Sequence, residues 1–174
     1  MKKSLYSALS IIISFLFFSN LNAQLSGTYN VPGDYATPFA AQSALQSNGI
    51  SGPVIISIVD GQYIGTLTVS NIPGTSATNT VTYQSASGNR AGVILIEATS
   101  AVRFTGGASY VILKDLTAEN VQTGSSAINF AGACNDITLD NVLVKNPITT
   151  SGNSFQSTIR LSLIHISEPT RPST

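Results

Sequence analysis

The chain has 174 residues, which suffices for one domain with a buried core. Only 9% of the residues are charged, against roughly a quarter in an average soluble domain, and this argues against a helical bundle covered with Lys and Glu. Between Gln24 and Arg160 there are five bases and seven acids, a net charge of −2. Because no basic patch exists to neutralise phosphates, we expect no nucleic-acid binding.

The first 23 residues have the layout of a secretory signal peptide. Lys2 and Lys3 precede an apolar run from Leu5 to Phe18, and a small polar stretch ends at Ala23. The apolar run is shorter than the roughly 20 residues that a membrane span needs, and no positively charged stop-transfer segment follows it. We therefore expect the export machinery to recognise this leader, which is then cleaved. The mature chain would be secreted or lie on the outer cell surface, with no membrane span.

Residues 24–52 are expected to form an N-terminal cap with one strand and one helix. Gly27 to Val31 has the pattern of a short strand. Thr37 is a suitable helix N-cap, and Pro38 suits the first helical position. Gly49 is placed to terminate this helix after about three turns.

Residues 53–160 contain short apolar and β-branched segments separated by Gly- and Pro-containing turns, which is typical of β-structure. The expected strands in the first half of this region are Val54–Val59, Tyr63–Val69, Thr80–Tyr83 and Val93–Ile96.

An internal repeat occupies the second half of this region. Residues 101–120 align without gaps on residues 127–146, at an offset of 26 residues. A period of about 20 to 50 residues is typical of solenoids, and each repeat here contains three strand-like segments. The sequence therefore predicts an all-β fold, a right-handed parallel β-helix, whose open N-terminal end the short helix covers.

The repeat also predicts which residues stack on neighbouring coils. We expect Phe104 beside Phe130 and Leu113 beside Leu139 in the core, because equivalent residues of successive coils are in register. Asn120 and Asn146 are expected to form an amide ladder at a corner, where asparagine tolerates the left-handed conformation.

Residues 161–174 resemble the translation of a transposase-based sequencing adapter. One frame of that adapter encodes the eleven residues from Leu161 to Arg171 without a mismatch. The alternative is a natural edge strand from Leu161 to Ile166. We interpret the segment as adapter-derived, exclude His165, the only histidine, from any site, and expect the natural protein to continue beyond Arg160.

Several short motifs resemble secreted surface proteins of Bacteroidota that have a right-handed β-helix similar in fold to pectin lyases. The motifs are Gly27-Thr28-Tyr29, Asp34-Tyr35-Ala36-Thr37, Gly52-Pro53-Val54, Asp60-Gly61-Gln62-Tyr63 and Ile72-Pro73-Gly74. The resemblance covers about residues 27–146. It implies a surface location and, as such proteins often have one, a type IX secretion sorting domain further along the natural chain.

β-Helix polysaccharide lyases and hydrolases, by this resemblance, use carboxylates and bases on adjacent coils. The repeat instead places acids against bases, amides or a tyrosine, in the pairs Asp136/Tyr110, Asp140/Lys114, Asp115/Asn141 and Glu119/Lys145, while Arg103 lies under Asn129. Asp115 and Asp140 could still approach diagonally and are the candidate site residues. We assign no other catalytic residue, and we expect no cofactor and no metal.

The other residues that could take part in catalysis or binding are expected to have structural roles. Cys134, the only cysteine, is expected to fill the core, because the chain lacks a partner histidine for a nucleophile. Three tyrosines, Tyr63, Tyr83 and Tyr110, could stack on sugar rings. The favoured alternative is that they are ordinary strand residues, since tyrosine has a high β-propensity. Gly106-Gly107 is expected to be a turn and not a phosphate-binding loop.

These observations leave three functional hypotheses open. The leading one is an exported β-helix scaffold for adhesion or glycan binding, with extracellular polysaccharide or cell-surface glycan as partner. The alternatives are a polysaccharide lyase or glycoside hydrolase whose catalytic coils lie beyond Arg160, and a purely structural surface stalk.

Overall fold

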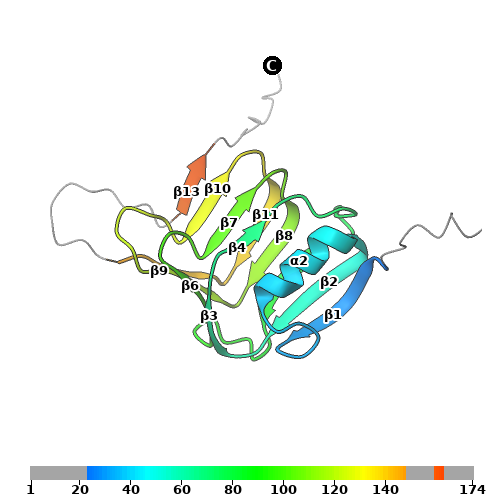
Figure 1. Cartoon of the computed structure of the whole chain (residues 1–174), viewed down its shortest axis with the longest axis horizontal. Helices are drawn as coiled ribbons and strands as arrows, with labels where there is room; N and C mark the ends of the chain where they lie inside the picture. Colours follow the sequence, from blue (N-terminus) through cyan, green and yellow to red (C-terminus); the bar gives the residue numbers. More distant parts are fainter. Residues whose placement is uncertain (1–22, 148–158, 163–174) are drawn as a thin grey trace, which may run out of the picture.

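The computed structural model describes residues 23–147 and 159–162, and these wind into a parallel β-helix of about four coils (Figure 1). The strands of the first two coils are β2 (Ile50–Ile58), β3 (Gly61–Ile64), β4 (Leu67–Val69), β5 (Val81–Ser85), β6 (Val93–Glu97) and β7 (Val102–Thr105). Those of the next two are β8 (Ser109–Lys114), β9 (Thr117–Asn120), β10 (Ile128–Ala131), β11 (Asn135–Asp140), β12 (Leu143–Lys145) and β13 (Ile159–Ser162). Ahead of them come β1 (Leu25–Val31) and helix α2 (Pro38–Asn48).

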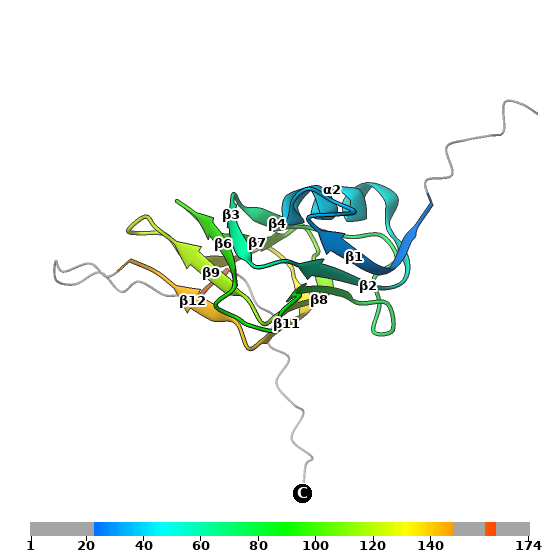
Figure 2. The ribbon, with the colours of Figure 1, turned by 90° about the horizontal axis from the view of Figure 1, so that it is seen from below.

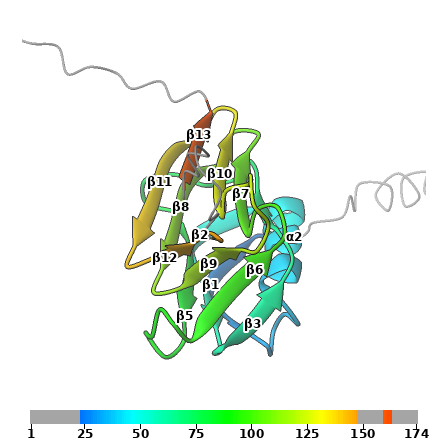
Figure 3. The ribbon, with the colours of Figure 1, turned by 90° about the vertical axis from the view of Figure 1, so that its left-hand side faces the viewer.

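Three sheets form the sides of the helix, and every strand pair in them is parallel. We call them sheet A, in the order β1-β2-β5-β8-β11, sheet B, in the order β3-β6-β9-β12, and sheet C, in the order β4-β7-β10-β13. Figure 3 shows the strands of successive coils following one another along each side. This topology confirms the predicted fold class, an all-β parallel β-helix with one short helix.

The core consists of the inward-facing side chains, which form rows along the axis of the β-helix. Val54, Val81 and Val111 are neighbours in one such row of sheet A, and all three are fully buried. The rings of Phe104 and Phe130 stack with their centroids 5.0 Å apart, on paired strands of sheet C. Leu113 pairs with Leu139 in sheet A. The predicted stacking is therefore confirmed.

Helix α2 covers the N-terminal end of the β-helix, as predicted (Figure 2). It begins where the Thr37 hydroxyl accepts a hydrogen bond of 3.1 Å from the Ala40 N–H, and it ends at Gly49, whose φ is 69°. Sheets B and C begin only with β3 and β4, and α2 packs against β4 where no earlier strand of sheet C precedes it. Its buried side chains, Ala41 and Leu45 among them, belong to the core.

Two details of the prediction are wrong. The expected strand from Tyr63 to Val69 is two strands, β3 and β4, because the chain turns a corner at Gly65, where φ is 140°. A second difference concerns the proposed amide ladder: Asn120 and Asn146 have no positive φ, so they do not use the left-handed conformation that asparagine tolerates. The Asn120 amide instead bonds to the main chain, donating to the Thr99 carbonyl at 2.9 Å and accepting from the Gln122 N–H.

Among the described residues, the left-handed non-glycine residues lie at two other positions of the repeat, one near the start of β8 and of β11 and one directly after each of these strands. They are Tyr110 and Asp136, with φ of 56° and 52°, and Asp115 and Asn141, with φ of 51° and 52°. Each pair occupies equivalent positions of successive coils. At three of these four positions the residue is Asp or Asn, which tolerate this conformation because their short polar side chains bond locally.

The signal peptide falls almost wholly outside the described residues, in 1–22, and its prediction stands untested. The tail that we interpret as adapter-derived begins within β13, which contains Leu161 and Ser162, and its remaining residues lie outside the described part of the chain. The pairing of β13 with β10 continues sheet C by one strand.

Candidate functional site

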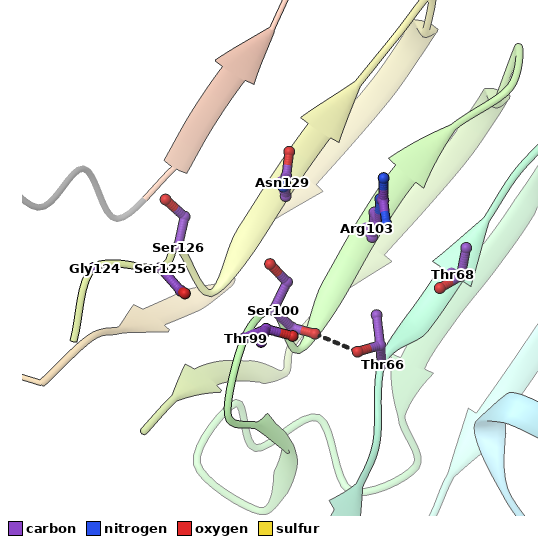
Figure 4. Close-up of a pocket in the computed structure, with 9 residues that line it drawn as sticks. All are labelled: Thr66, Thr68, Thr99, Ser100, Arg103, Gly124, Ser125, Ser126 and Asn129. Carbon is purple, nitrogen blue, oxygen red and sulfur yellow. Dashed lines mark hydrogen bonds between the residues drawn. The ribbon is translucent and has the colours of Figure 1, made fainter. Parts of the chain in front are cut away.

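The outer face of sheet C carries a groove of about 460 Å³ whose lining residues have polar side chains, with the exception of Gly124 (Figure 4). We call it the polar groove. It is lined by Thr66, Thr68, Thr99, Ser100, Arg103, Gly124, Ser125, Ser126 and Asn129. These residues come from β4, β7 and β10 and from the loops that lead into those strands. None of these nine described lining residues is acidic or aromatic.

The floor of the groove is a row of three side chains on adjacent strands. Thr68 pairs with Arg103, and Arg103 with Asn129, so the three are in register across β4, β7 and β10. They point outward because side chains alternate along a strand, and their neighbours, such as Leu67 and Phe104, point into the core. Strands in a sheet are about 4.8 Å apart, so the row presents one polar group per coil.

The walls of the groove are the loops before β7 and β10. The Thr66 hydroxyl donates a hydrogen bond of 2.8 Å to the Ser100 carbonyl, which ties the loop before β7 to the start of β4. The Ala127 N–H donates a bond of 3.0 Å to Asn146 Oδ1, which anchors the loop before β10. Ser100 and Ser126 are buried at 8% and 7% exposure. The loops are therefore fixed at their bases.

Arg103 is the cation of the groove, and its surroundings differ from those of the other bases in residues 23–147. Lys114 and Lys145 each form an ion pair of 3.5 Å with a carboxylate of an adjacent coil. Arg90 donates a hydrogen bond of 3.3 Å to Asn141 Oδ1. For Arg103, which is exposed, the described part of the chain provides no hydrogen bond and no ion pair.

The candidate carboxylates Asp115 and Asp140 lie at one corner, and each is engaged with a different partner. The Asp115 N–H donates to the Asp140 carbonyl at 3.0 Å, so their main chains are adjacent. The Asp115 carboxylate accepts a hydrogen bond of 2.7 Å from the Asn141 amide, whereas Asp140 pairs with Lys114. Each carboxylate therefore contacts a side chain of the adjacent coil. No cluster of metal-ligating side chains occurs among the described residues.

The cysteine, tyrosines and glycines singled out in the sequence lie in positions that the fold itself explains. Burial raises the pKa of the half-buried Cys134 thiol, which packs against the core. Tyr83 is fully buried and cannot reach a sugar ring, and the Tyr63 hydroxyl donates to the Val59 carbonyl at 2.9 Å. Gly106 and Gly107 both have positive φ, as the predicted turn requires.

Sequence reasoning found Arg103 and Asn129 as a stacked pair but not the groove. The third member of the row, Thr68, is 35 residues before Arg103, whereas the visible repeat has an offset of 26. Longer turns in the second coil conceal this pairing. A search for outward Thr, Arg and Asn residues at each strand of one sheet would have found the row, once the register was known.

The fold places this chain in the class of parallel β-helix proteins. A scan against protein-family models and searches of the curated proteins and of the solved structures found no match for it. Within the described residues, no helix has the length and hydrophobicity of a membrane span.

Proposed function

We propose that this chain is part of an exported or cell-surface protein whose β-helix serves as an adhesion scaffold and binds glycans at the polar groove. The proposal includes a signal-peptide-directed route out of the cell. It also includes kinship with the secreted, pectin-lyase-like surface proteins of Bacteroidota that often carry type IX sorting domains, which the motifs from Gly27 to Gly74 resemble.

The observation that carries the proposal is the hydrogen-bonding character of the groove. Hydroxyl, amide and guanidinium groups from two walls and a floor converge on it. Sugars present many hydroxyl groups that both donate and accept, and a rigid array of such partners can orient them. Each coil contributes one residue to the row of Thr68, Arg103 and Asn129. The row can therefore contact successive units of an extended polymer.

The engagement of Asp115 and Asp140 favours binding over hydrolysis. A pair of catalytic carboxylates needs one group free to take or give a proton at the glycosidic bond. Here one carboxylate accepts from the Asn141 amide and the other is paired with Lys114. We therefore favour the scaffold hypothesis over the enzyme hypothesis. The scaffold hypothesis differs from the stalk hypothesis because it requires a ligand.

The test is binding of the purified protein to a panel of extracellular polysaccharides, comparing Thr68→Val with Thr138→Val. Both threonines are exposed on outer sheet faces, but Thr138 lies on sheet A, away from the groove. We expect Thr68→Val to weaken binding about 3- to 10-fold, the loss of one hydrogen bond, and Thr138→Val to leave it unchanged. Absence of binding to every polymer contradicts the proposal, and release of reducing or unsaturated sugar favours the lyase or hydrolase alternative.

A further inference from the structure

The charge in the polar groove narrows the class of ligand. We propose, on the basis of the proposed function above, that the groove selects glycans bearing an oxyanion, either a sulfate ester or a carboxylate, and that Arg103 is the residue that determines this specificity. A neutral polymer offers the guanidinium hydroxyl acceptors but no negative charge to pair with it.

The first argument is that the Arg103 charge has no partner among the described residues. Lys114, Lys145 and Arg90 each contact an acceptor side chain on another coil. Arg103 contacts none within the described residues, and no carboxylate is among the nine lining residues. The fold thus pairs three of its described bases across coils and leaves a cation in the groove, which an anionic ligand group can complete.

The second argument is geometric. The planar guanidinium presents parallel N–H donors that match the two oxygens of a carboxylate or sulfate. Thr68 and Asn129 lie on either side of Arg103, about 4.8 Å away along the row, and they add a hydroxyl and an amide donor within reach of the same group.

The third argument is that the described lining contains no aromatic side chain. The groove therefore offers no flat apolar surface on which the face of a neutral sugar could stack. Tyr83 is inside the core, and Tyr63 contacts the Val59 carbonyl on another side of the β-helix. Recognition in this groove must therefore rest on polar and charged groups, among which Arg103 is the strongest donor.

The test measures binding of the purified protein to one polysaccharide backbone in three forms: cellulose oligomers, carboxymethylated cellulose and cellulose sulfate. Four proteins are compared: the wild type, Arg103→Gln, Arg103→Lys and Arg90→Gln. Arg90→Gln removes the same charge from an exposed arginine outside the groove, and it serves as the matched control. Circular dichroism and the melting temperature verify that each variant is folded.

We expect at least one anionic form to bind about 10-fold or more tightly than the neutral form. Arg103→Gln should weaken that binding about 10- to 100-fold, the loss of a charged bidentate contact. Arg103→Lys should lose less, and Arg90→Gln should remain within about 2-fold of the wild type. Which of the two anionic polymers depends on Arg103 identifies the source of the oxyanion. Competition by free inorganic sulfate that is abolished in Arg103→Gln supports the same conclusion.

Two results overturn this inference while leaving the proposed function intact. One is neutral cellulose binding as tightly as the anionic forms, with sensitivity to Thr68→Val and not to Arg103→Gln. The other is an equal loss of anionic binding in Arg103→Gln and Arg90→Gln, because the binding then depends on the net charge of the protein and not on the groove. In this case neutral polymer must still bind, and Thr68→Val must weaken that binding, for the proposed function to stand. Binding of none of the three forms overturns the specificity for oxyanion-bearing glycans, and the proposed function falls only if the wider polysaccharide panel also gives no binding.

Discussion

At the scale of single residues, the most consequential contact links the capping helix to the second coil through the core. Tyr83 of β5 is fully buried, and its hydroxyl donates a hydrogen bond to Gln42 Oε1 of α2, which is itself only 3% exposed. Gln42 Nε2 has no partner among the described residues. A buried polar pair of this kind costs little when it is satisfied and much when one member is removed.

We predict that Tyr83→Phe lowers the free energy of unfolding by about 1–3 kcal/mol, because it leaves the Gln42 amide carbonyl buried without a donor. The double variant Tyr83→Phe/Gln42→Leu should recover most of this loss, because both polar groups are then absent. Denaturant unfolding followed by circular dichroism measures both. A neutral single variant, or a double variant less stable than the single one, would contradict the importance of this contact.

The same residue gives the protein a dependence on alkaline pH. Burial raises the pKa of Tyr83 well above its usual value of 10.0, so the folded state keeps the phenol protonated while the unfolded state ionises. Stability from this group is present below about pH 10 and is lost as the pH rises above it. Tyr83→Phe should show a smaller decline in unfolding free energy above pH 10 than the wild type.

At the scale of elements, the turns decide how closely successive coils approach. The turn after β4 lies against the start of β2, where the Ile50 N–H donates to the Pro73 carbonyl at 2.8 Å. A Cβ added to Gly74 in this turn would lie 2.0 Å from the Ile50 carbonyl oxygen, and the residue has φ of 91°. Gly88, in the turn after β5, has φ of 71° but no atom within 4 Å of such a Cβ.

These two glycines form a matched pair, because both have positive φ and only one is crowded. We predict that Gly88→Ala costs about 1–2 kcal/mol of stability, the strain of a left-handed alanine, and that Gly74→Ala costs clearly more, since it also displaces the start of β2. Thermal and denaturant unfolding of the two variants measures the difference. Equal losses would show that the turn after β4 can move away from β2 without cost.

At the scale of the whole molecule, the proposed signal peptide ends close to the first strand of the β-helix. The described residues start at Ala23, and β1 begins at Leu25 and pairs with β2. Export would require the leader to be accessible to a peptidase ahead of this first strand. The expected cleavage after Ala23 leaves β1 intact, with all of its pairing to β2.

We predict that the exported protein begins at Gln24 or at a residue close to it, with the glutamine cyclised. Intact-mass and N-terminal peptide mass spectrometry of the secreted or surface fraction measures this. A variant with Leu16→Arg, which interrupts the apolar run of the leader, should accumulate inside the cell in unprocessed form. Recovery of mature surface protein that still carries residues 1–23 would refute the signal-peptide interpretation.

The sequence by itself determined the class of fold and much of its register. The offset of 26 residues placed Phe104 beside Phe130 and Leu113 beside Leu139, because parallel strands of successive coils keep equivalent residues in contact. The helix from Pro38 to Asn48 followed from its capping residues, since Thr37 and Gly49 act locally. Local signals and a visible repeat are sufficient for such features.

The tertiary structure alone decided the polar groove. Thr68 and Arg103 are neighbours only because the turns of the second coil absorb extra residues, and turn lengths between stacked strands leave no periodic signal in a sequence. The partners of the candidate carboxylates, by contrast, followed from the offset of 26 residues, which placed Asp115 against Asn141 and Asp140 against Lys114, and both contacts are present. Where irregular turns separate the strands, as between Thr68 and Arg103, contacts across coils depend on a register that only the packed β-helix defines.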